Sequence, residues 1–224
     1  MKFIGHLDLM RYFQKVMRRA DVNIRYSEGF SPHQIMSFAS PLGVGMESRG
    51  EYVDIEVLSS DSSKEMLRRI NSVIGNEMEA LSYRLLPDNA ANAMSIVAAA
   101  DYAVRFRPGC EPADWDSIVK GLDSFMAQEE IMIMKKTKKG DKEMNLRPLI
   151  YELSADKDAI FMKIATGSAA NIKPDVVIGA YMSSRGEELK DFALMVTRME
   201  VYANKGSEDK PEFTALEDFG EDIE

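Results

Sequence analysis

The two histidines are the side chains of this sequence best suited to chemistry near neutral pH. His6 and His33 are its only histidines, and a free imidazole has a pKa of about 6.5. The pair could act as general acid and base on an RNA phosphodiester, or bind a metal ion together with a carboxylate. We expect the catalytic candidates to line one pocket or groove near the loop of residues 41–50; they are His6, His33, Asp8, Glu28 and Glu47.

A structural role for these histidines is the favoured alternative. Each one lies beside a turn at the end of an expected helix or strand. A histidine in such a place commonly caps the helix or bonds a backbone carbonyl. The residues by themselves therefore do not define an enzyme, and we favour a non-catalytic role over an enzymatic one.

Cationic side chains form a second group of candidates. Between Asp8 and Ala20 they recur on one face at helical spacing, while apolar residues occupy the opposite face. A lysine-rich segment follows at residues 135–142. Both clusters suit the phosphate oxygens of RNA, although a solvated helix face or a contact with an acidic protein explains the first cluster equally well. The candidate RNA-binding residues are Arg11, Lys15, Arg18, Arg19, Arg25, Lys136, Lys138, Lys139 and Arg147.

Gly167 and Ser168 are candidates for an anion site. They precede an expected helix, and the backbone N–H groups of a helix N-terminus can bind an anion. Arg147 is a candidate second contact for that anion. Ordinary helix capping explains the same two residues.

Composition excludes several classes of protein. Cys110 is the only cysteine, so a single chain forms no disulfide and no cysteine-only zinc or iron–sulfur site. The sequence has no zinc-protease motif and no P-loop, and we expect neither a metal nor a cofactor. Its longest apolar runs are far shorter than the roughly 20 residues that cross a bilayer, and its N-terminus lacks a secretory signal. We therefore expect a cytoplasmic protein with no membrane association.

Spacing of apolar residues predicts an α+β fold in two halves. In the first half we expect a strand at residues 1–4, a helix from Asp8 to Ala20, a hairpin of strands at 35–39 and 51–57, a helix after the Ser62 and Glu65 capping box, and a strand near 78–85. The element order is β-α-β-β-α-β. This is the order of the split βαβ, or ferredoxin-like, arrangement, in which antiparallel strands carry two helices.

The second half repeats this order with one extra strand. We expect strands at 102–106, 131–136, 146–153, 160–164 and 193–202, a helix that begins at Pro112, and a helix with Pro174 in its first turn. The predicted organisation is a first ferredoxin-like half at 1–86, a linker at 87–99, a second ferredoxin-like half at 100–203 and a tail at 204–224. Two such halves leave open sheet faces, which in many proteins bind RNA.

The C-terminal segment from Lys205 to Glu224 differs from the rest of the chain. It carries two lysines against eight acidic residues, within a chain whose net charge is −9. A segment rich in Glu and Asp, with only the scattered apolar residues Phe213, Leu216, Phe219 and Ile223, is typical of disorder. We expect a disordered solubilising tail.

Several motifs of the sequence resemble those of the radical-SAM-linked protein family of unknown function. They are Gly5 to Met10, Tyr26 to His33, Ser37-Phe38, Pro41 to Ser48, Glu51 to Asp54, Lys136 to Gly140, Leu146 to Ile150, and Thr197-Arg198. Members usually have a small hydroxyl residue where Gly5 stands and Asn-Pro-His-Pro where this chain has Ser31-Pro32-His33-Gln34. The resemblance implies a small protein encoded beside, or fused to, a cobalamin-binding-type radical SAM protein. It implies no catalytic residue, because the family has none assigned.

Two functions are compatible with these observations. The favoured one is a non-catalytic accessory or substrate-presenting module that works with a radical SAM protein and binds structured RNA. The alternative is an RNA-processing or RNA-modifying enzyme that uses His6 and His33 on a tandem ferredoxin-like scaffold.

Overall fold

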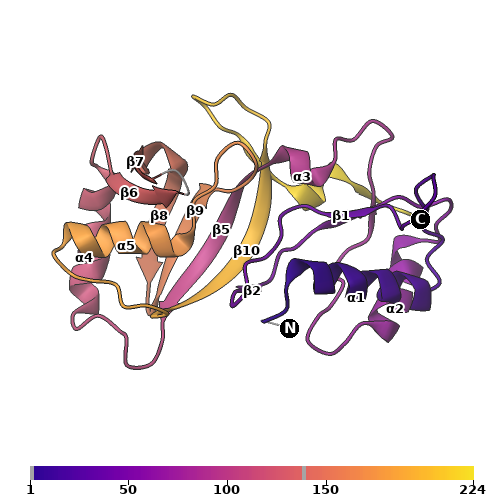
Figure 1. Cartoon of the computed structure of the whole chain (residues 1–224), viewed down its shortest axis with the longest axis horizontal. Helices are drawn as coiled ribbons and strands as arrows, with labels where there is room; N and C mark the ends of the chain where they lie inside the picture. Colours follow the sequence, from indigo (N-terminus) through magenta and orange to yellow (C-terminus); the bar gives the residue numbers. More distant parts are fainter. Residues whose placement is uncertain (1–2, 138–139) are drawn as a thin grey trace. The chain divides into compact units, whose positions relative to one another are not determined.

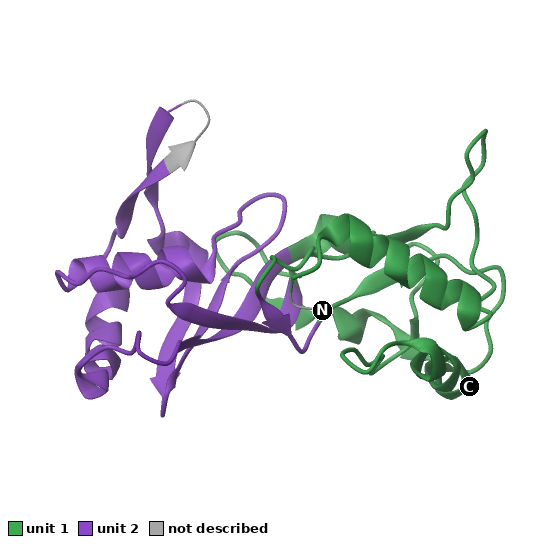
Figure 2. Ribbon diagram, turned by 60° about the horizontal axis from the view of Figure 1, so that its bottom comes forward, with its two compact units in different colours: residues 1–45, 51–97, 203–224 green, residues 46–50, 98–202 purple. Residues whose placement is uncertain are grey.

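A computed structural model describes residues 3–137 and 140–224, without the side chains of 136 and 137. The chain divides into two compact units (Figure 2), of which unit 1 comprises residues 1–45, 51–97 and 203–224 and unit 2 comprises residues 46–50 and 98–202. The fold is mixed α+β with antiparallel sheets, as expected. The predicted limits of the domains stay predictions, because this division does not test whether each part folds alone.

Unit 1 is built on two helices and a short hairpin. The helices are α1 (His6–Arg19) and α2 (Ser63–Val73), and the strands β1 (Met36–Phe38) and β3 (Val53–Ile55) pair antiparallel. A four-residue helix, α3 (Ala93–Ile96), ends the central part of the unit. The apolar stripe of α1 packs with α2 and the hairpin in one core that includes Val16, Met17, Met66 and Ile70.

The local signals of unit 1 are partly confirmed. The Ser62 hydroxyl accepts a hydrogen bond from the Glu65 backbone N–H at the start of α2, as the capping box predicts. The strand expected at residues 1–4 is absent at Phe3 and Ile4, and residues 1 and 2 lie outside the described part. The strand expected near 78–85 is reduced to β4 (Arg84–Leu85). Among the described residues, unit 1 therefore shows no first strand of the predicted β-α-β-β-α-β order and only two residues of the last one.

The C-terminal segment is ordered, and the expectation of a disordered tail was wrong for residues 213–223. It contains β11 (Phe213–Ala215), the 3-10 turn η2 (Leu216–Phe219) and β12 (Glu221–Asp222). β12 pairs antiparallel with β4, and Leu216 is buried. Arg84 forms ion pairs with Glu217 and Asp222. Apolar side chains spaced along the acidic segment thus supply the burial that composition alone does not reveal.

Unit 2 contains a larger sheet with two helices. Four long strands lie in the order β10-β5-β9-β8, and β5 and β8 are both antiparallel to β9. Their bounds are β5 (Val97–Phe106), β8 (Ile150–Asp156), β9 (Ala159–Ala165) and β10 (Leu194–Asn204). The short strand β2 (Glu47–Ser48) adds to β10 in parallel. The helices α4 (Trp115–Met126) and α5 (Pro174–Ser184) lie together on one side of this sheet (Figure 1).

A separate hairpin is inserted between α4 and β8. It pairs β6 (Met132–Thr137) with β7 (Gly140–Asn145). The strand expected at residues 146–153 begins instead at Ile150, because Arg147–Leu149 form a 3-10 turn, η1. Pro174 occupies the first turn of α5, as its position in the sequence predicts. Among the helices of the described residues, none is long and apolar enough to cross a membrane.

Candidate nucleic-acid interface

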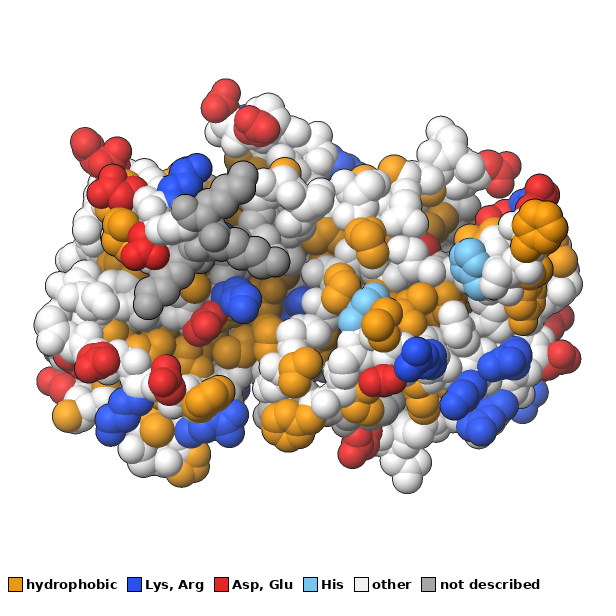
Figure 3. All heavy atoms as spheres, in the orientation of Figure 1, with side chains coloured by type: hydrophobic (Ala, Val, Ile, Leu, Met, Phe, Trp, Pro, Cys, Tyr) orange, Lys and Arg blue, Asp and Glu red, His pale blue; other side chains and the backbone are white. Residues whose placement is uncertain are grey.

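The exposed face of α1 carries the cations that the sequence singles out. The opposite face of this helix buries Val16 and Met17 in the core of unit 1. Because an α-helix repeats every 3.6 residues, that burial directs the side chains at the other positions into solvent. Figure 3 shows Lys and Arg side chains gathered over α1. The exposed cations of this helix are Arg11, Lys15, Arg18 and Arg19.

Two of the five predicted cations of this region are neutralised by carboxylates. Arg11 pairs with Asp8 one turn earlier at 3.1 Å. Arg25 pairs with Glu56 of the neighbouring strand segment at 2.5 Å. These two arginines therefore have a structural partner in the free protein.

The other three cations have no carboxylate partner among the described residues. Within the part of the chain that the structure describes, Lys15, Arg18 and Arg19 form no ion pair. Arg18 donates only to the Gln14 carbonyl, at 3.2 Å. The helix dipole favours Arg18 and Arg19, which lie in the last turn, but it does not neutralise them. We call Lys15, Arg18 and Arg19 the cationic face.

A closed loop adjoins this face. Residues 27–33 connect Tyr26 to Gln34, which form an isolated antiparallel bridge. The side-chain amide of Gln34 donates to the Gln14 carbonyl at 3.3 Å, and Gln34 itself is buried. Since Arg18 donates to the same carbonyl, the base of the loop lies next to the cationic face.

The two histidines have separate surroundings. The His6 ring stands edge-on to Phe38, with 5.8 Å between ring centroids. The His33 Nδ1 lies 2.9 Å from the Ser27 hydroxyl and 3.4 Å from the Ser31 carbonyl. In Figure 3 other side chains lie between the two pale blue rings.

Each carboxylate proposed to assist the histidines has its own surroundings. Asp8 is engaged with Arg11, Glu28 is exposed, and Glu47 belongs to β2 of unit 2. Among the described residues, no group of three His, Cys, Asp or Glu side chains could hold a metal ion. Within the described part of the chain, the polar contacts of the His33 ring are to Ser27 and Ser31 rather than to a carboxylate, and a site shared by both histidines stays a prediction.

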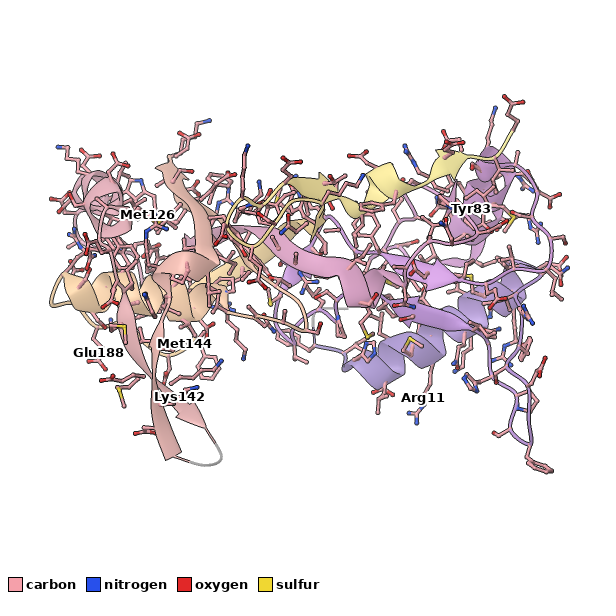
Figure 4. The ribbon with its side chains drawn as sticks, turned by 90° about the horizontal axis from the view of Figure 1, so that it is seen from above. Arg11, Tyr83, Met126, Lys142, Met144 and Glu188 are labelled. Carbon is pink, nitrogen blue, oxygen red and sulfur yellow. The ribbon has the colours of Figure 1, made fainter. Side chains whose placement is uncertain are left out.

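The hairpin of β6 and β7 carries exposed cations in the half of its ladder nearer Thr137 and Gly140. Lys135 and Lys142 are exposed and stand opposite each other across the two strands; Figure 4 labels Lys142 on this hairpin. Like charges at opposed positions are unfavourable unless an anion intervenes or the side chains diverge into solvent. The side chain of Lys136 and the residues Lys138 and Lys139 lie outside the described part.

Arg147 has a structural role. Its Nε donates to the Met126 carbonyl at the end of α4, at 2.8 Å, and its Nη1 donates to the Ile150 carbonyl at 3.1 Å. The guanidinium thereby joins the end of α4 to the start of β8. The sequence predicted RNA binding for this arginine and not these hydrogen bonds, because the Met126 and Ile150 carbonyls come close to each other only in the folded unit.

Gly167 and Ser168 do not lie at a helix N-terminus. They follow β9, and α5 begins only at Pro174 after its N-cap Lys173. Gly167 has a φ of 142°, which a glycine tolerates well. The expectation that these residues lie at the start of the helix was therefore wrong, and anion binding by them stays a prediction.

Sequence reasoning missed a polar cluster on the sheet of unit 2. Lys163 of β9 lies 3.7 Å from Asp101 of β5 and 3.1 Å from Glu152 of β8. The Tyr202 hydroxyl donates to Asp101 at 2.6 Å, and Lys163 lies over the tyrosine ring. Burial and the Asp101 carboxylate raise the pKa of Tyr202. The alternation of polar residues in the strands is the signal that could have placed these side chains on one face.

Comparisons with known proteins place the chain in a family. Residues 1–174 match a model described as an uncharacterised protein conserved in bacteria, DUF2344. The matched region includes the whole of α1, the loop of residues 27–33 and the hairpin β6–β7. Comparison with curated proteins found no match, and neither did comparison with solved structures. The chain belongs to the DUF2344 family of uncharacterised bacterial proteins.

Proposed function

We propose that this protein is a non-catalytic accessory module that binds RNA through the cationic face of α1. The observation that carries the proposal is the absence of a carboxylate partner for Lys15, Arg18 and Arg19 within the described residues. Like charges one turn apart destabilise a helix by a few tenths of a kcal/mol per pair, and the cost is relieved when an anion binds. Arg11 and Arg25, whose charges are already neutralised, contribute less.

The fold is compatible with such a module. The strand order β10-β5-β9-β8 of unit 2, with both helices on one side, supports the proposal that this unit is ferredoxin-like, since that arrangement has its first and third strands at the centre. Unit 1 gives less support to a second ferredoxin-like half, because its hairpin consists of β1 and β3 and a ferredoxin-like sheet has four strands. Fold alone does not specify function, so the proposal depends on the cationic face.

A radical SAM enzyme is the proposed partner. This part of the proposal rests on the resemblance of the motifs around Gly5 to Met10 and Pro41 to Ser48 to the radical-SAM-linked family. The accessory module would hold an RNA for an enzyme that carries its own cluster, because Cys110 is the only cysteine here. Co-elution of the purified chain with the radical SAM enzyme of the same organism, in gel filtration, tests this partner.

Salt-dependent affinity tests the RNA proposal. We would measure binding of a labelled RNA hairpin with single-stranded flanks at several salt concentrations, for the intact protein, for Lys15→Ala/Arg19→Ala and for Lys64→Ala/Lys120→Ala. The last variant removes the same charge from exposed positions on α2 and α4. Each lost phosphate contact reduces the slope of log affinity against log salt by about one.

The expected result is a slope reduced by about two for the α1 variant and unchanged for the control variant. Equal losses in the two variants would show that only net charge matters. Negligible affinity of the intact protein at low salt would refute RNA binding and would leave the cationic face as a solvated surface or a contact for an acidic protein.

A further inference from the structure

Phe30 is the most exposed large apolar side chain of the described residues. Its relative exposure is 112%, whereas the next most exposed, Phe192, reaches 90%. An apolar ring that stays in water does not gain the free energy that its burial would provide. The ring at the tip of this loop is outside the core and is accessible to a ligand.

The loop that carries Phe30 is closed by hydrogen bonds rather than loose. The Ser27 N–H donates to the His33 carbonyl at 2.8 Å, and the His33 N–H donates to the Ser27 hydroxyl at 3.1 Å. Gly29, next to Phe30, has a φ of 109° in the left-handed region, which lets the chain turn at the tip. The ring is therefore held out on a defined support.

The same loop is tied to the cationic face. Gln34 closes the loop and donates to the Gln14 carbonyl, which also accepts from Arg18. In Figure 4 the loop beyond the C-terminal end of α1 projects on the side of the helix to which Arg11 points. An extended strand of a few nucleotides that follows α1 would therefore meet the ring.

We infer that the RNA bound by α1 is single-stranded and that one of its bases stacks on Phe30. The inference rests on the proposed function and adds the class of RNA to it. Lys15, Arg18 and Arg19 would contact the phosphates, and the ring would offer a face to an unstacked base. Aromatic rings beside a cationic groove are the usual means of binding single strands without sequence preference.

The neighbours of Phe30 favour this ligand over others. A base inside a duplex is already stacked on both sides and cannot use the ring. Insertion into an anionic membrane would place Glu28 against like charge, and the flanking residues Gly29 and Ser31 add no apolar area. A protein partner would need a contiguous apolar patch, whereas this ring is flanked by small and polar residues.

Fluorescence polarisation with defined oligonucleotides tests the inference. The probes are an unstructured ten-nucleotide oligo(A), a ten-base-pair RNA duplex and anionic phosphatidylserine vesicles. The variants are Phe30→Ala, the matched control Phe192→Ala in unit 2, and Lys15→Ala/Arg19→Ala. Because Phe30 is exposed, its replacement leaves the core intact, and thermal unfolding curves check that each variant is folded.

Phe30→Ala is expected to weaken oligo(A) binding about tenfold, the loss typical of one stacked base, with the salt slope and the duplex affinity unchanged. Phe192→Ala is expected to bind as the intact protein does. If Phe30→Ala binds oligo(A) normally while Lys15→Ala/Arg19→Ala loses affinity, the stacking inference fails and the proposed function stands. If the intact protein binds neither RNA, both fail. Tighter binding to the vesicles than to oligo(A) also overturns the inference.

Discussion

Replacing Gly121 of α4 by alanine should destabilise unit 2, although alanine is the better helix former. A Cβ at this position would overlap the hydroxyl of Tyr181 and lie 2.9 Å from Nη1 of Arg185. Tyr181 is buried, with only 1% of its surface exposed, and its hydroxyl donates to the Ile118 carbonyl at 2.5 Å. Gly121 thus lets α5 approach α4 closely.

The expected change in the free energy of unfolding combines two costs and one gain. Overpacking a core position costs about 1–3 kcal/mol, and displacement of the tyrosine hydroxyl from Ile118 costs about 1 kcal/mol. The higher helix propensity of alanine returns about 1 kcal/mol. The free energy of unfolding should therefore fall by about 1–3 kcal/mol.

Gly179→Ala on α5 is the matched control. The nearest side chain to its added Cβ is Leu189, at 4.0 Å, so this change should leave stability unchanged or raise it by up to about 1 kcal/mol. Tyr181→Phe removes the atom that clashes and should cost about 1 kcal/mol alone. In the double variant with Gly121→Ala, the two costs should not add.

Urea unfolding of the four proteins and the double variant measures these differences. A coupling free energy of about 1–2 kcal/mol between Gly121→Ala and Tyr181→Phe is expected, well above the additivity error of about 0.5 kcal/mol. If the two glycine substitutions change stability equally, or if the double variant is simply additive, the close approach of α4 and α5 at Gly121 is refuted.

Three further perturbations test other parts of the fold. Arg147→Ala should lower the free energy of unfolding in urea by about 2 kcal/mol, because the charged guanidinium donates to two carbonyls. The salt slope of RNA binding should stay unchanged; unchanged stability with a reduced slope would contradict the structural role of Arg147. The pKa of Tyr202 is raised in the folded state, so the protonated hydroxyl stabilises the fold fully below about pH 10 and this stabilisation is lost as the pH rises further. Tyr202→Phe should remove that loss in unfolding curves recorded below and above this pH. An identical pH dependence in the two proteins would contradict the raised pKa of Tyr202. Deletion of residues 205–224 should lower the melting temperature, since Leu216 is buried and β12 pairs with β4. An unchanged melting temperature would support the disordered tail instead.

Local sequence patterns determined most of the elements. The helical spacing between Asp8 and Ala20, the Ser62 cap and Pro174 each predicted a helix that the structure contains. The hairpin β1–β3 and the strands β9 and β10 also follow from their apolar patterns. These signals are readable because capping and amphipathic periodicity involve residues close together in the chain. The cationic face of α1 could be predicted for the same reason.

For several charged side chains, the partner was decided only by the tertiary structure. Asp8 neutralises Arg11 from one turn away, but Glu56 reaches Arg25 only because their segments are brought together in unit 1. Arg147 was a surface candidate in the sequence and became a link between α4 and β8. Long-range contacts of this kind depend on which elements pack together, and composition does not encode them locally.

The acidic segment and the loop of Phe30 show the same division. Residues 213–223 have the composition of a disordered tail, yet Leu216 finds a buried position and Arg84 finds Glu217 and Asp222. Phe30 looked like any apolar residue near a turn, and only folding decided that it remains in solvent. The sequence determined residue types and periodicity, whereas burial and pairing depended on segments far apart in the chain, because a side chain's free energy is set by the neighbours that folding brings to it.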